Sequence, residues 1–388
     1  MKYDFDTVIE RKGTSCFKYD GLKEVYGRDD LIPLWIADMD FQIAPQIKAA
    51  MQERLNHGIF GYNQRLPIYY DTIINWTKKR YGYEPQEDWI MTSPGIMPAI
   101  NLAVMQLTEP GDSVLIQTPV YQPFFTAATA HNRKLVTNPL LPDNGYYTID
   151  FDDFEKKLKE VKLFILCSPH NPVGRRWNKD ELLKIGTLCR QYNVPIISDE
   201  IHCDLIYNGA GSLSIASLEG MLDNTIVCFS PAKSFNLAGL ATSVIIAKNP
   251  DLREPLNTML ENLHIYMGNT FGITALTAAY GDSEDWLEEL LIYLQDNRDF
   301  LVDYIQSEIP QLKISTPEAT YLAWIDFRNL GLNDEELQKF LVEKAGLALE
   351  PGIKYGIEGS GFQRLNFGCP RKTLSTALVR LKKAINEL

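Results

Sequence analysis

The sequence predicts an α/β protein in which a doubly wound, mainly parallel sheet is joined to a smaller α+β domain. From about residue 47 to residue 288, apolar runs of strand length alternate with stretches of helix length, the pattern of a parallel sheet covered by helices. The chain has 388 residues, more than a single core usually holds. We therefore expect a large domain over residues 47–288 and a small discontinuous domain from residues 1–46 and 289–388.

The large domain should contain at least five recognisable strands and a crossover helix. Runs of apolar residues bounded by turn residues are typical of strands that are buried on both faces of a sheet. Residues 225–229, for example, are almost entirely apolar. The expected strands are 89–92, 113–117, 163–167, 194–197 and 225–229, and the expected helix is 179–192.

A long amphipathic helix leads into the second domain. Ser283 is a candidate N-cap, acidic residues follow it in the first turn, and Pro310 ends the helix. Its apolar positions, at 286, 290, 294, 301 and 305, share one face. Beyond it we expect strands at 321–327 and 362–367 and helices at 333–344 and 372–388.

Composition and charge argue against several classes of function. The formal net charge is −12, whereas nucleic-acid and anionic-membrane surfaces need clustered Lys and Arg. No apolar run approaches the length of a membrane span, and the first twelve residues carry charges where a signal peptide would be apolar. These observations lead us to expect a cytoplasmic protein that binds neither nucleic acid nor membrane.

Metal and nucleotide sites are not expected either. The five histidines lack the spacing of metal ligands, and the six cysteines are scattered without a C-x-x-C motif. A P-loop and a G-x-G-x-x-G motif after a strand are both absent. The chemistry must therefore come from other residues.

Three polar side chains each follow one of the expected parallel strands. Asn171 lies in Ser-Pro-His-Asn-Pro-Val-Gly (168–174), Asp199 in Ser-Asp-Glu-Ile-His (198–202), and Lys233 in Ser-Pro-Ala-Lys (230–233). The carboxyl ends of parallel strands are where open α/β sheets bind ligands. One amine able to form an imine, one carboxylate able to keep a ring nitrogen protonated and one amide donor indicate a pyridoxal-phosphate site.

These motifs resemble those of the aminotransferase-type, or fold type I, pyridoxal-phosphate enzymes. The match is closer to the cystathionine β-lyase branch often called MalY/PatB, the carbon–sulfur lyases. Its further motifs are Pro-Leu-Trp-Ile-Ala-Asp-Met-Asp-Phe (33–41), Asp-Glu-Ile-His (199–202) and Lys-Ser-Phe-Asn-Leu-Ala-Gly-Leu (233–240). The resemblance extends from the N-terminal segment to Arg364. It implies an aminotransferase fold and pyridoxal 5′-phosphate as the cofactor.

The resemblance gives the strand-end residues their roles. Lys233 would hold the cofactor covalently and then take the substrate Cα proton, which requires a pKa below the usual value of about 10.4. Asp199 would pair with the ring nitrogen, and Asn171 would donate to the ring phenolate oxygen. His202 would touch that oxygen or orient Asp199, and a purely structural histidine would fit as well. The resemblance leaves open whether the bond from Asn171 to Pro172 is cis.

The phosphate group needs backbone N–H donors at the start of a helix. Gly95, Ile96 and Met97 follow an expected strand and open an apolar helix, and Ser230 could add its hydroxyl group. In the family a tyrosine from the partner subunit of a homodimer reaches the phosphate, and Tyr62 matches it. A tyrosine between such turn residues also often serves packing alone.

Three further residues match the family's substrate side. Tyr121 corresponds to an aromatic residue that stacks on the cofactor ring, although a core aromatic would look the same. Arg364 would bind the α-carboxylate of the substrate bidentately, with a surface ion pair as the alternative. The backbone at Ala37 matches the segment that closes over the substrate, and Asn171 would contact the substrate too.

Two departures from the aminotransferase pattern favour the lyase branch. Aminotransferases of this fold usually carry a tyrosine where His202 stands, and an arginine where residues 238–241 are Ala-Gly-Leu-Ala. We therefore expect a homodimeric carbon–sulfur β-lyase that converts L-cystathionine or a cysteine S-conjugate to a thiol, pyruvate and ammonia. An aminotransferase on the same scaffold, and a regulatory binding protein that retains a lyase scaffold, remain alternatives.

Overall fold

The structure, a computed structural model, describes residues 1–388. Its largest feature is a seven-stranded sheet made of β2 (Ile90–Ser93), β3 (Ser113–Ile116), β4 (Lys134–Thr137), β7 (Leu163–Cys167), β8 (Ile196–Asp199), β9 (Thr225–Phe229) and β10 (Ser243–Ala247). The strand order is β2-β10-β9-β8-β7-β3-β4. Only β10 runs antiparallel to its neighbours, β9 and β2. This confirms the mainly parallel α/β sheet.

Helices cover both faces of this sheet because its strands are apolar on both sides. Alternate strand residues such as Phe164 and Ile165 belong to different hydrophobic clusters, as the two-residue period of a strand requires. One face packs on α5 (Ile96–Leu107), α6 (Pro123–Thr129) and α10 (Pro250–Asn262). The other packs on α7 (Phe151–Leu158), α8 (Lys179–Gln191), α4 (Pro67–Trp76) and α11 (Thr270–Asp282).

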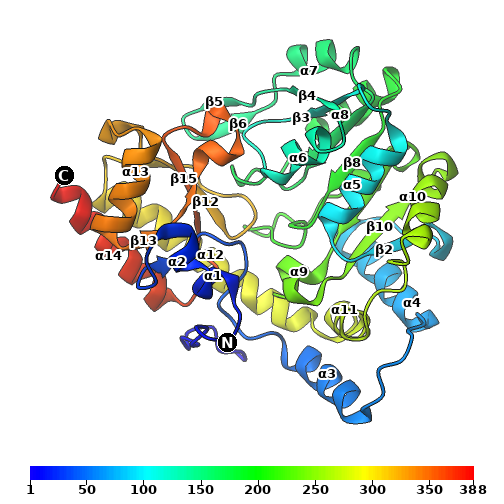
Figure 1. Ribbon diagram of the computed structural model, residues 1–388, viewed down its shortest axis with the longest axis horizontal. Helices are drawn as coiled ribbons and strands as arrows, with labels where there is room; N and C mark the ends of the chain where they lie inside the picture. The colour runs from blue at the N-terminus through cyan, green and yellow to red at the C-terminus, as the bar shows by residue number, and fades with distance from the viewer.

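A second, antiparallel sheet forms from the C-terminal part of the chain. It consists of β11 (Lys313–Ile314), β12 (Leu322–Asp326), β15 (Phe362–Asn366) and β14 (Glu350–Pro351), in that order. The helices α13 (Asp334–Phe340), α14 (Arg371–Asn386) and α12 (Glu284–Glu308) pack around it in the largest hydrophobic cluster. Figure 1 shows α12, in yellow, running between the two sheets.

The N-terminal segment packs beside this C-terminal part, as expected. β1 (Ile32–Pro33) pairs in parallel with β13 (Leu347–Ala348), and α1 (Phe17–Asp20) and α2 (Leu22–Tyr26) lie next to them in Figure 1. The domain boundaries at residues 47 and 288 stay a prediction.

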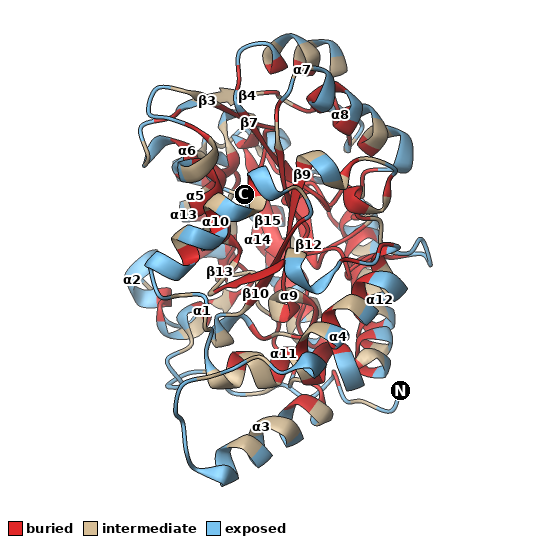
Figure 2. Cartoon of the chain, turned by 90° about the vertical axis from the view of Figure 1, so that its right-hand side faces the viewer, coloured by how far each residue is buried: buried red, intermediate tan, exposed pale blue.

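Short elements complete the chain. The remaining helices and strands are α3 (Pro45–His57), α9 (Pro231–Ser234), β5 (Leu141–Asp143) and β6 (Tyr146–Thr148). The 3-10 turns are η2 (Glu87–Trp89), η3 (Ile215–Ser217), η4 (Leu222–Asn224), η5 (Ala238–Leu240), η6 (Arg328–Leu330), η8 (Gly352–Tyr355) and η9 (Ile357–Gly359), and the π turns are η1 (Thr77–Tyr81) and η7 (Leu341–Ala345). No helix is both long and apolar enough to cross a membrane. In Figure 2 the buried residues follow the sheet, while α3 projects with mostly exposed or half-buried residues.

Three details differ from the expectation. β8 begins and ends two residues later than expected, so Asp199 is its last residue. Ser283 does stand at the N-cap of α12, but its hydroxyl group donates to the carbonyl of Ala278 at 2.9 Å and caps no N–H of α12. The expected helix over residues 333–344 ends as α13 at Phe340 and continues as the π turn η7.

Candidate active site

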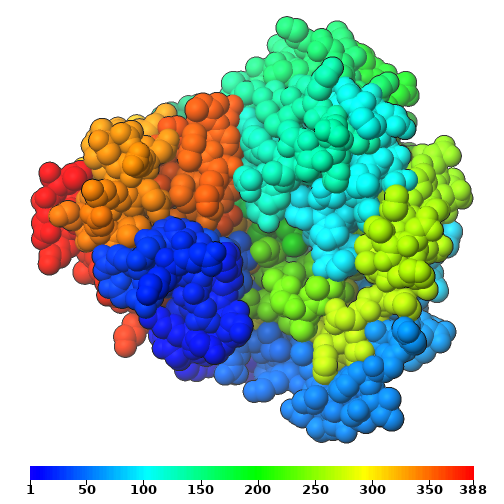
Figure 3. All heavy atoms as spheres, viewed as in Figure 1, coloured from blue at the N-terminus to red at the C-terminus, as the bar shows by residue number.

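A cavity of about 640 Å³ opens at the carboxyl ends of β7, β8 and β9. Residues from the N-terminal segment, the seven-stranded sheet and the four-stranded sheet all line it. Figure 3 shows the hollow between the dark blue N-terminal residues, the orange C-terminal residues and the cyan and green residues of the large sheet. Ligands of open α/β sheets bind at this edge, and cavities of about 300–1,000 Å³ take small molecules.

Lys233 reaches into the cavity from the short helix α9. Ser230 caps this helix by accepting a hydrogen bond from the N–H of Ala232 at 3.0 Å, which fixes the turn after β9. The Nζ atom of Lys233 donates to the carbonyl oxygen of Ala37 at 2.5 Å. Burial, together with the nearby Arg364 cation, lowers the pKa of Lys233 to about 8. A lysine with this pKa is neutral in part near neutral pH, as a nucleophile or base must be.

Asp199 presents a carboxylate without a counter-cation to the same cavity. Its side chain is buried, and its only hydrogen bond comes from the N–H of Ile201 to Oδ1 at 3.1 Å. Burial raises the pKa of Asp199 to about 7, against the lowering effects of that N–H and of Lys233. A buried carboxylate is costly unless a cationic or protonated partner meets it. The site therefore suits a ligand that brings a protonated nitrogen to Asp199.

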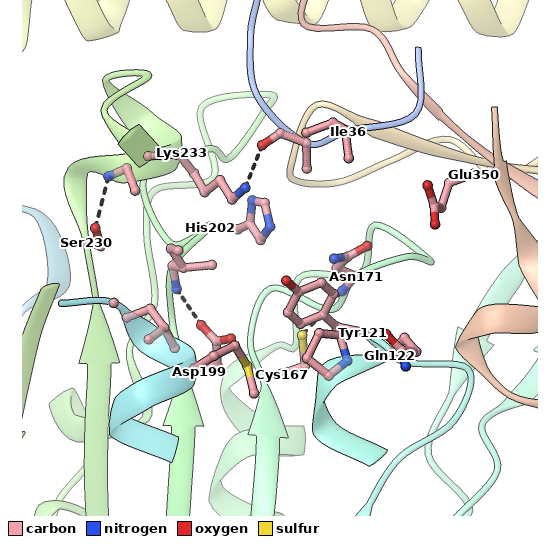
Figure 4. A pocket seen from close by; sticks show the side chains of 18 of the residues that line it. Ile36, Tyr121, Gln122, Cys167, Asn171, Asp199, His202, Ser230, Lys233 and Glu350 are labelled. Atoms are coloured by element: carbon pink, nitrogen blue, oxygen red, sulfur yellow. Dashed lines mark hydrogen bonds between the residues drawn. The ribbon is translucent and has the colours of Figure 1, made fainter. Parts of the chain in front are cut away.

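Asn171 and Tyr121 lie on the next loops along the sheet. The bond between Asn171 and Pro172 is cis, and the carbonyl of Asn171 accepts the N–H of Tyr121 at 3.1 Å. The side-chain oxygen of Asn171 accepts from Arg364 Nη1 at 3.3 Å, which leaves its amide N–H groups free to donate. Figure 4 shows the Asn171 and Tyr121 side chains side by side within the cavity.

His202 lies in the cavity next to Lys233 (Figure 4). The imidazole is buried, and its Nδ1 atom has no hydrogen-bond partner. Burial lowers the pKa of His202, and the cations of Lys233 and Arg364 lower it further, so the ring is neutral. Because Nδ1 is itself buried, the ring can offer a ligand in the cavity its other nitrogen, Nε2.

The start of α5 supplies backbone donors to the cavity. Gly95, Ile96 and Met97 line it, and the first N–H groups of a helix have no partner within the helix. Ser230 lines it too, but its hydroxyl group donates to the carbonyl of Thr242 at 2.7 Å. The Ser230 proton is therefore committed, and we expect the α5 amides to contribute more to anion binding.

Arg364 is held at the cavity wall by three neighbours. Its Nη2 atom donates to the carbonyl of Trp35 at 2.7 Å, and its guanidinium lies 5.3 Å from the centre of the Tyr355 ring. Nη1 contacts Asn171, as described above, and the buried Nε atom has no partner. The group is thus buried and oriented, with donor capacity left for a ligand.

The backbone at Ala37 forms part of the same wall. Its carbonyl oxygen accepts from the Tyr321 hydroxyl group at 2.9 Å as well as from Lys233. The side chain of Asn366 donates to the carbonyls on either side, those of Ile36 and Asp38, at 2.6 Å each. The N-terminal segment is therefore held over the cavity by both sheets.

Tyr62 is the one predicted site residue that the chain does not bring to the cavity. It is 96% exposed and lies on the segment after α3. A site that needs its hydroxyl group would have to receive it from a second copy of the chain.

Several cavity residues were missed by the sequence analysis. Ile36, Gln122, Glu350, Lys354 and Tyr355 all line the cavity. Glu350 pairs directly opposite Arg364 in the β14–β15 ladder, so a prediction of that register would have found it. Ile36 lies inside the motif at residues 33–41, next to Ala37, so that motif could have found it, whereas no local motif marks Gln122, Lys354 and Tyr355.

Comparison with known proteins places the chain in a family. The model for "Aminotransferase class I and II" matches residues 29–381. The chain belongs to this family. Cystathionine beta-lyase PatB of Bacillus subtilis (strain 168) is 42% identical over 99% of this chain and 100% of its own length. Protein MalY of Escherichia coli (strain K12) is 34% identical over 99% of each chain.

Solved structures of the family share the fold and contain a cofactor. A pyridoxal-phosphate-bound putative aminotransferase from Clostridium difficile 630 has a TM-score of 0.97 and 44% identity, covering 99% of this chain and 100% of its own. Cystalysin from Treponema denticola, solved with pyridoxal 5′-phosphate, has a TM-score of 0.96 and 37% identity over all of both chains. The resemblance to fold type I enzymes and to the MalY/PatB branch is thereby confirmed.

Proposed function

We propose that the protein is a pyridoxal-phosphate-dependent carbon–sulfur β-lyase that acts on S-substituted cysteines such as L-cystathionine. The observation that carries the proposal is the meeting of Lys233, Asp199 and Asn171 in one cavity at the ends of three adjacent strands. The lyase names of PatB and of the cystathionine beta-lyase of Corynebacterium glutamicum support the reaction class. So do His202 and the alanines of residues 238–241, where aminotransferases usually carry tyrosine and arginine.

The residues of the cavity fit pyridoxal 5′-phosphate. The Asp199 carboxylate, which lacks a cation in this chain, would pair with the ring nitrogen, and Asn171 and His202 would face the ring oxygen. Tyr121 would cover the ring. The amides of Gly95, Ile96 and Met97 would hold the phosphate, and Ser230 would join them only by giving up its hydrogen bond to the carbonyl of Thr242. When bound, the cofactor supplies an electron sink that stabilises negative charge at the substrate Cα atom.

Arg364 would bind the substrate, and Lys233 would take a proton from it. Arg364 would bind the α-carboxylate through its guanidinium, with Asn171 beside it, and so orient the Cα–H bond. The Nζ atom of Lys233 would take the Cα proton, and its pKa of about 8 suits a base that works near neutral pH. A Cα=Cβ double bond would form from the electrons of the Cα–H bond as the Cβ–S bond breaks and the sulfur leaves as a thiolate with the electrons of that bond. Ala37 and its neighbours would keep water from the reacting atoms.

We also propose a homodimer in which each subunit lends Tyr62 to the other's phosphate site. An exposed apolar strip runs from the end of α3 to the start of α4 and supports this assembly, since monomers rarely expose such patches. It consists of Leu55, Ile59, Phe60, Tyr62, Leu66 and Ile68, each at least half exposed. Mixing inactive Tyr62→Phe and Lys233→Ala subunits should restore one functional site per mixed dimer, and failure to regain any activity would contradict the shared site.

We further propose two domains and a cytoplasmic location. The domains are residues 47–288 and residues 1–46 together with 289–388. Cleavage by limited proteolysis near residues 47 and 288 would support the boundaries. Fractionation of cells that express the protein would test the location.

The deciding experiment is the release of thiol and pyruvate from L-cystathionine by cofactor-loaded protein without a 2-oxo acid. Sustained, stoichiometric release of both products is expected, and Lys233→Ala should abolish it. Activity that appears only when a 2-oxo acid is added would instead identify an aminotransferase. Association with a transcription factor, without turnover of any amino acid, would indicate the regulatory alternative.

A further inference from the structure

Two charged side chains at the mouth of the cavity have no part in the chemistry described so far. Glu350 and Lys354 both line it, and Oε1 of Glu350 accepts from Nζ of Lys354 at 2.8 Å. The Glu350 side chain is only 14% exposed, whereas that of Lys354 is 46% exposed. Asp199 and Glu350 are the two carboxylates among the lining residues. Figure 4 shows Glu350 across the cavity from Asp199 and Lys233.

The sheet register sets Glu350 beside the substrate-binding arginine. Glu350 on β14 is directly opposite Arg364 on β15, and such pairs share a face with Cβ atoms about 4.5–5.5 Å apart. The two groups nevertheless form no ion pair, because Arg364 donates to Trp35 and Asn171 while Glu350 accepts from Lys354. Each therefore keeps its charge for a separate ligand group.

The surroundings keep this carboxylate within reach of a bound molecule. Tyr355, the residue after Lys354, is buried and also lines the cavity. The Oε2 atom of Glu350 has no hydrogen-bond partner in the chain. Lys354 uses one of its three donors on Glu350. The pair thus offers one free acceptor and free ammonium donors side by side.

We propose that Glu350 and Lys354 recognise a zwitterionic group on the thiol half of the substrate, with Glu350 taking its ammonium and Lys354 its carboxylate. This inference rests on the proposed lyase function. Arg364 then holds the carboxylate of the cysteine half, so the pair is left for the far end of a longer substrate. The preferred substrates are S-substituted cysteines whose leaving thiol is itself an amino acid, as in L-cystathionine.

Glu350 and Lys354 should favour substrates with a zwitterionic thiol half and also disfavour those with an apolar one. A zwitterionic thiol half replaces the water around Glu350 and Lys354 with charge-assisted hydrogen bonds. An apolar thiol half of the same length covers the pair and removes that water without a replacement, which costs free energy. Short S-alkyl groups do not reach the pair and escape both effects.

The test compares Glu350→Gln with the unaltered holoenzyme on four substrates. They are L-cystathionine, S-(3-carboxypropyl)-L-cysteine, which lacks the distal ammonium, S-(3-aminopropyl)-L-cysteine, which lacks the distal carboxylate, and S-methyl-L-cysteine. In Glu350→Gln we expect kcat/KM to fall about tenfold or more for the two substrates with a distal ammonium, L-cystathionine and the aminopropyl compound. It should stay within about twofold for the carboxypropyl and methyl compounds. Lys354→Gln should instead lower kcat/KM for the two substrates with a distal carboxylate, L-cystathionine and the carboxypropyl compound. Glu335→Gln, on an exposed turn of α13, is the matched control.

The same variants are also compared by binding, so the result does not depend on turnover. Dissociation constants for the four compounds come from the change that each makes in the visible absorption of the bound cofactor. An equal loss of affinity for all four compounds, or no loss of affinity for L-cystathionine, would overturn the proposed recognition. Absence of thiol release from every substrate by the unaltered enzyme would overturn the lyase function alone, because the binding ratios still decide the role of Glu350.

Discussion

Replacing Asp199 by Asn should stabilise the protein without cofactor and weaken the protein with it. In the cofactor-free chain the Asp199 carboxylate is buried without a cation, and its pKa is raised from 3.8 to about 7, mainly by burial. Such a rise corresponds to about 4 kcal/mol at a pH where both the folded and the unfolded chain are ionised. This is an upper value for the free energy that Asp199→Asn recovers.

The direction of the pH dependence follows from the number of protons that Asp199 binds in the folded and in the unfolded chain. Between pH 3.8 and about 7 the folded chain holds more protons at Asp199 than the unfolded chain does. The stability contribution of this group is therefore complete below pH 3.8 and is lost as the pH rises through about 7. The Asn side chain cannot ionise, so the variant escapes this loss and keeps the hydrogen bond from Ile201.

Urea unfolding of the cofactor-free proteins at pH 5 and pH 8 measures the effect. The free energy of unfolding of Asp199→Asn relative to the unaltered protein should increase from pH 5 to pH 8, while Asp71→Asn, on an exposed site of α4, shows no such increase. With cofactor bound, the variant should have weaker cofactor affinity and lower kcat, because the ring nitrogen loses its anionic partner. Identical pH dependence of the unfolding free energies for the two variants would refute the reasoning.

Three other outcomes are expected. Since the pKa of Lys233 is about 8 in the cofactor-free chain, the rate at which added pyridoxal 5′-phosphate forms its imine with the protein should rise about tenfold per pH unit below pH 8 and level off above it; a flat profile from pH 6 to 10, followed by visible absorption, would argue against Lys233 as the attacking amine. Arg364→Lys should raise KM about 10–100-fold with a smaller change in kcat, because lysine lacks the bidentate fork; steady-state kinetics would show it. Lys18→Met should lower the free energy of unfolding by about 1–2 kcal/mol, because the buried carboxylate of Asp40 loses the Lys18 ammonium at 2.9 Å and keeps only Arg11 as a cationic partner; adding Arg11→Met should enlarge the loss, and denaturant titration that shows no further loss would count against this cause.

The parts of the fold that local pattern determines were predictable. Apolar runs gave five of the seven strands of the large sheet to within two residues but missed β4 and β10. The order of Asn171, Asp199 and Lys233 along the chain was enough to bring them to one sheet edge. β8 begins at Ile196 rather than earlier, because pairing with β7 and β9 sets the ends of a strand. The Ser283 hydroxyl group found an acceptor in the preceding helix, and no sequence rule distinguishes that choice from an N-cap.

The parts of the site that depend on distant pairings were not predictable. Glu350 meets Arg364 only through the register of two short strands. The buried amine of Lys18 is matched by Asp40 through a loop whose path the sequence does not reveal. Tyr62 is fully exposed in a single chain, so a role for it can be argued only from the family resemblance and the apolar strip around it.

The hydrogen bond from Arg364 to the carbonyl of Trp35 joins residues 329 positions apart. During synthesis the strands around Asn171, Asp199 and Lys233 can assemble while the C-terminal quarter of the chain has yet to be made, since chains begin to fold from the N-terminus. The N-terminal segment, although made first, has to wait for its partners β13 and β15. The active site is therefore among the last features to form, and a nascent chain that stalls early carries a reactive lysine without the wall that shields it.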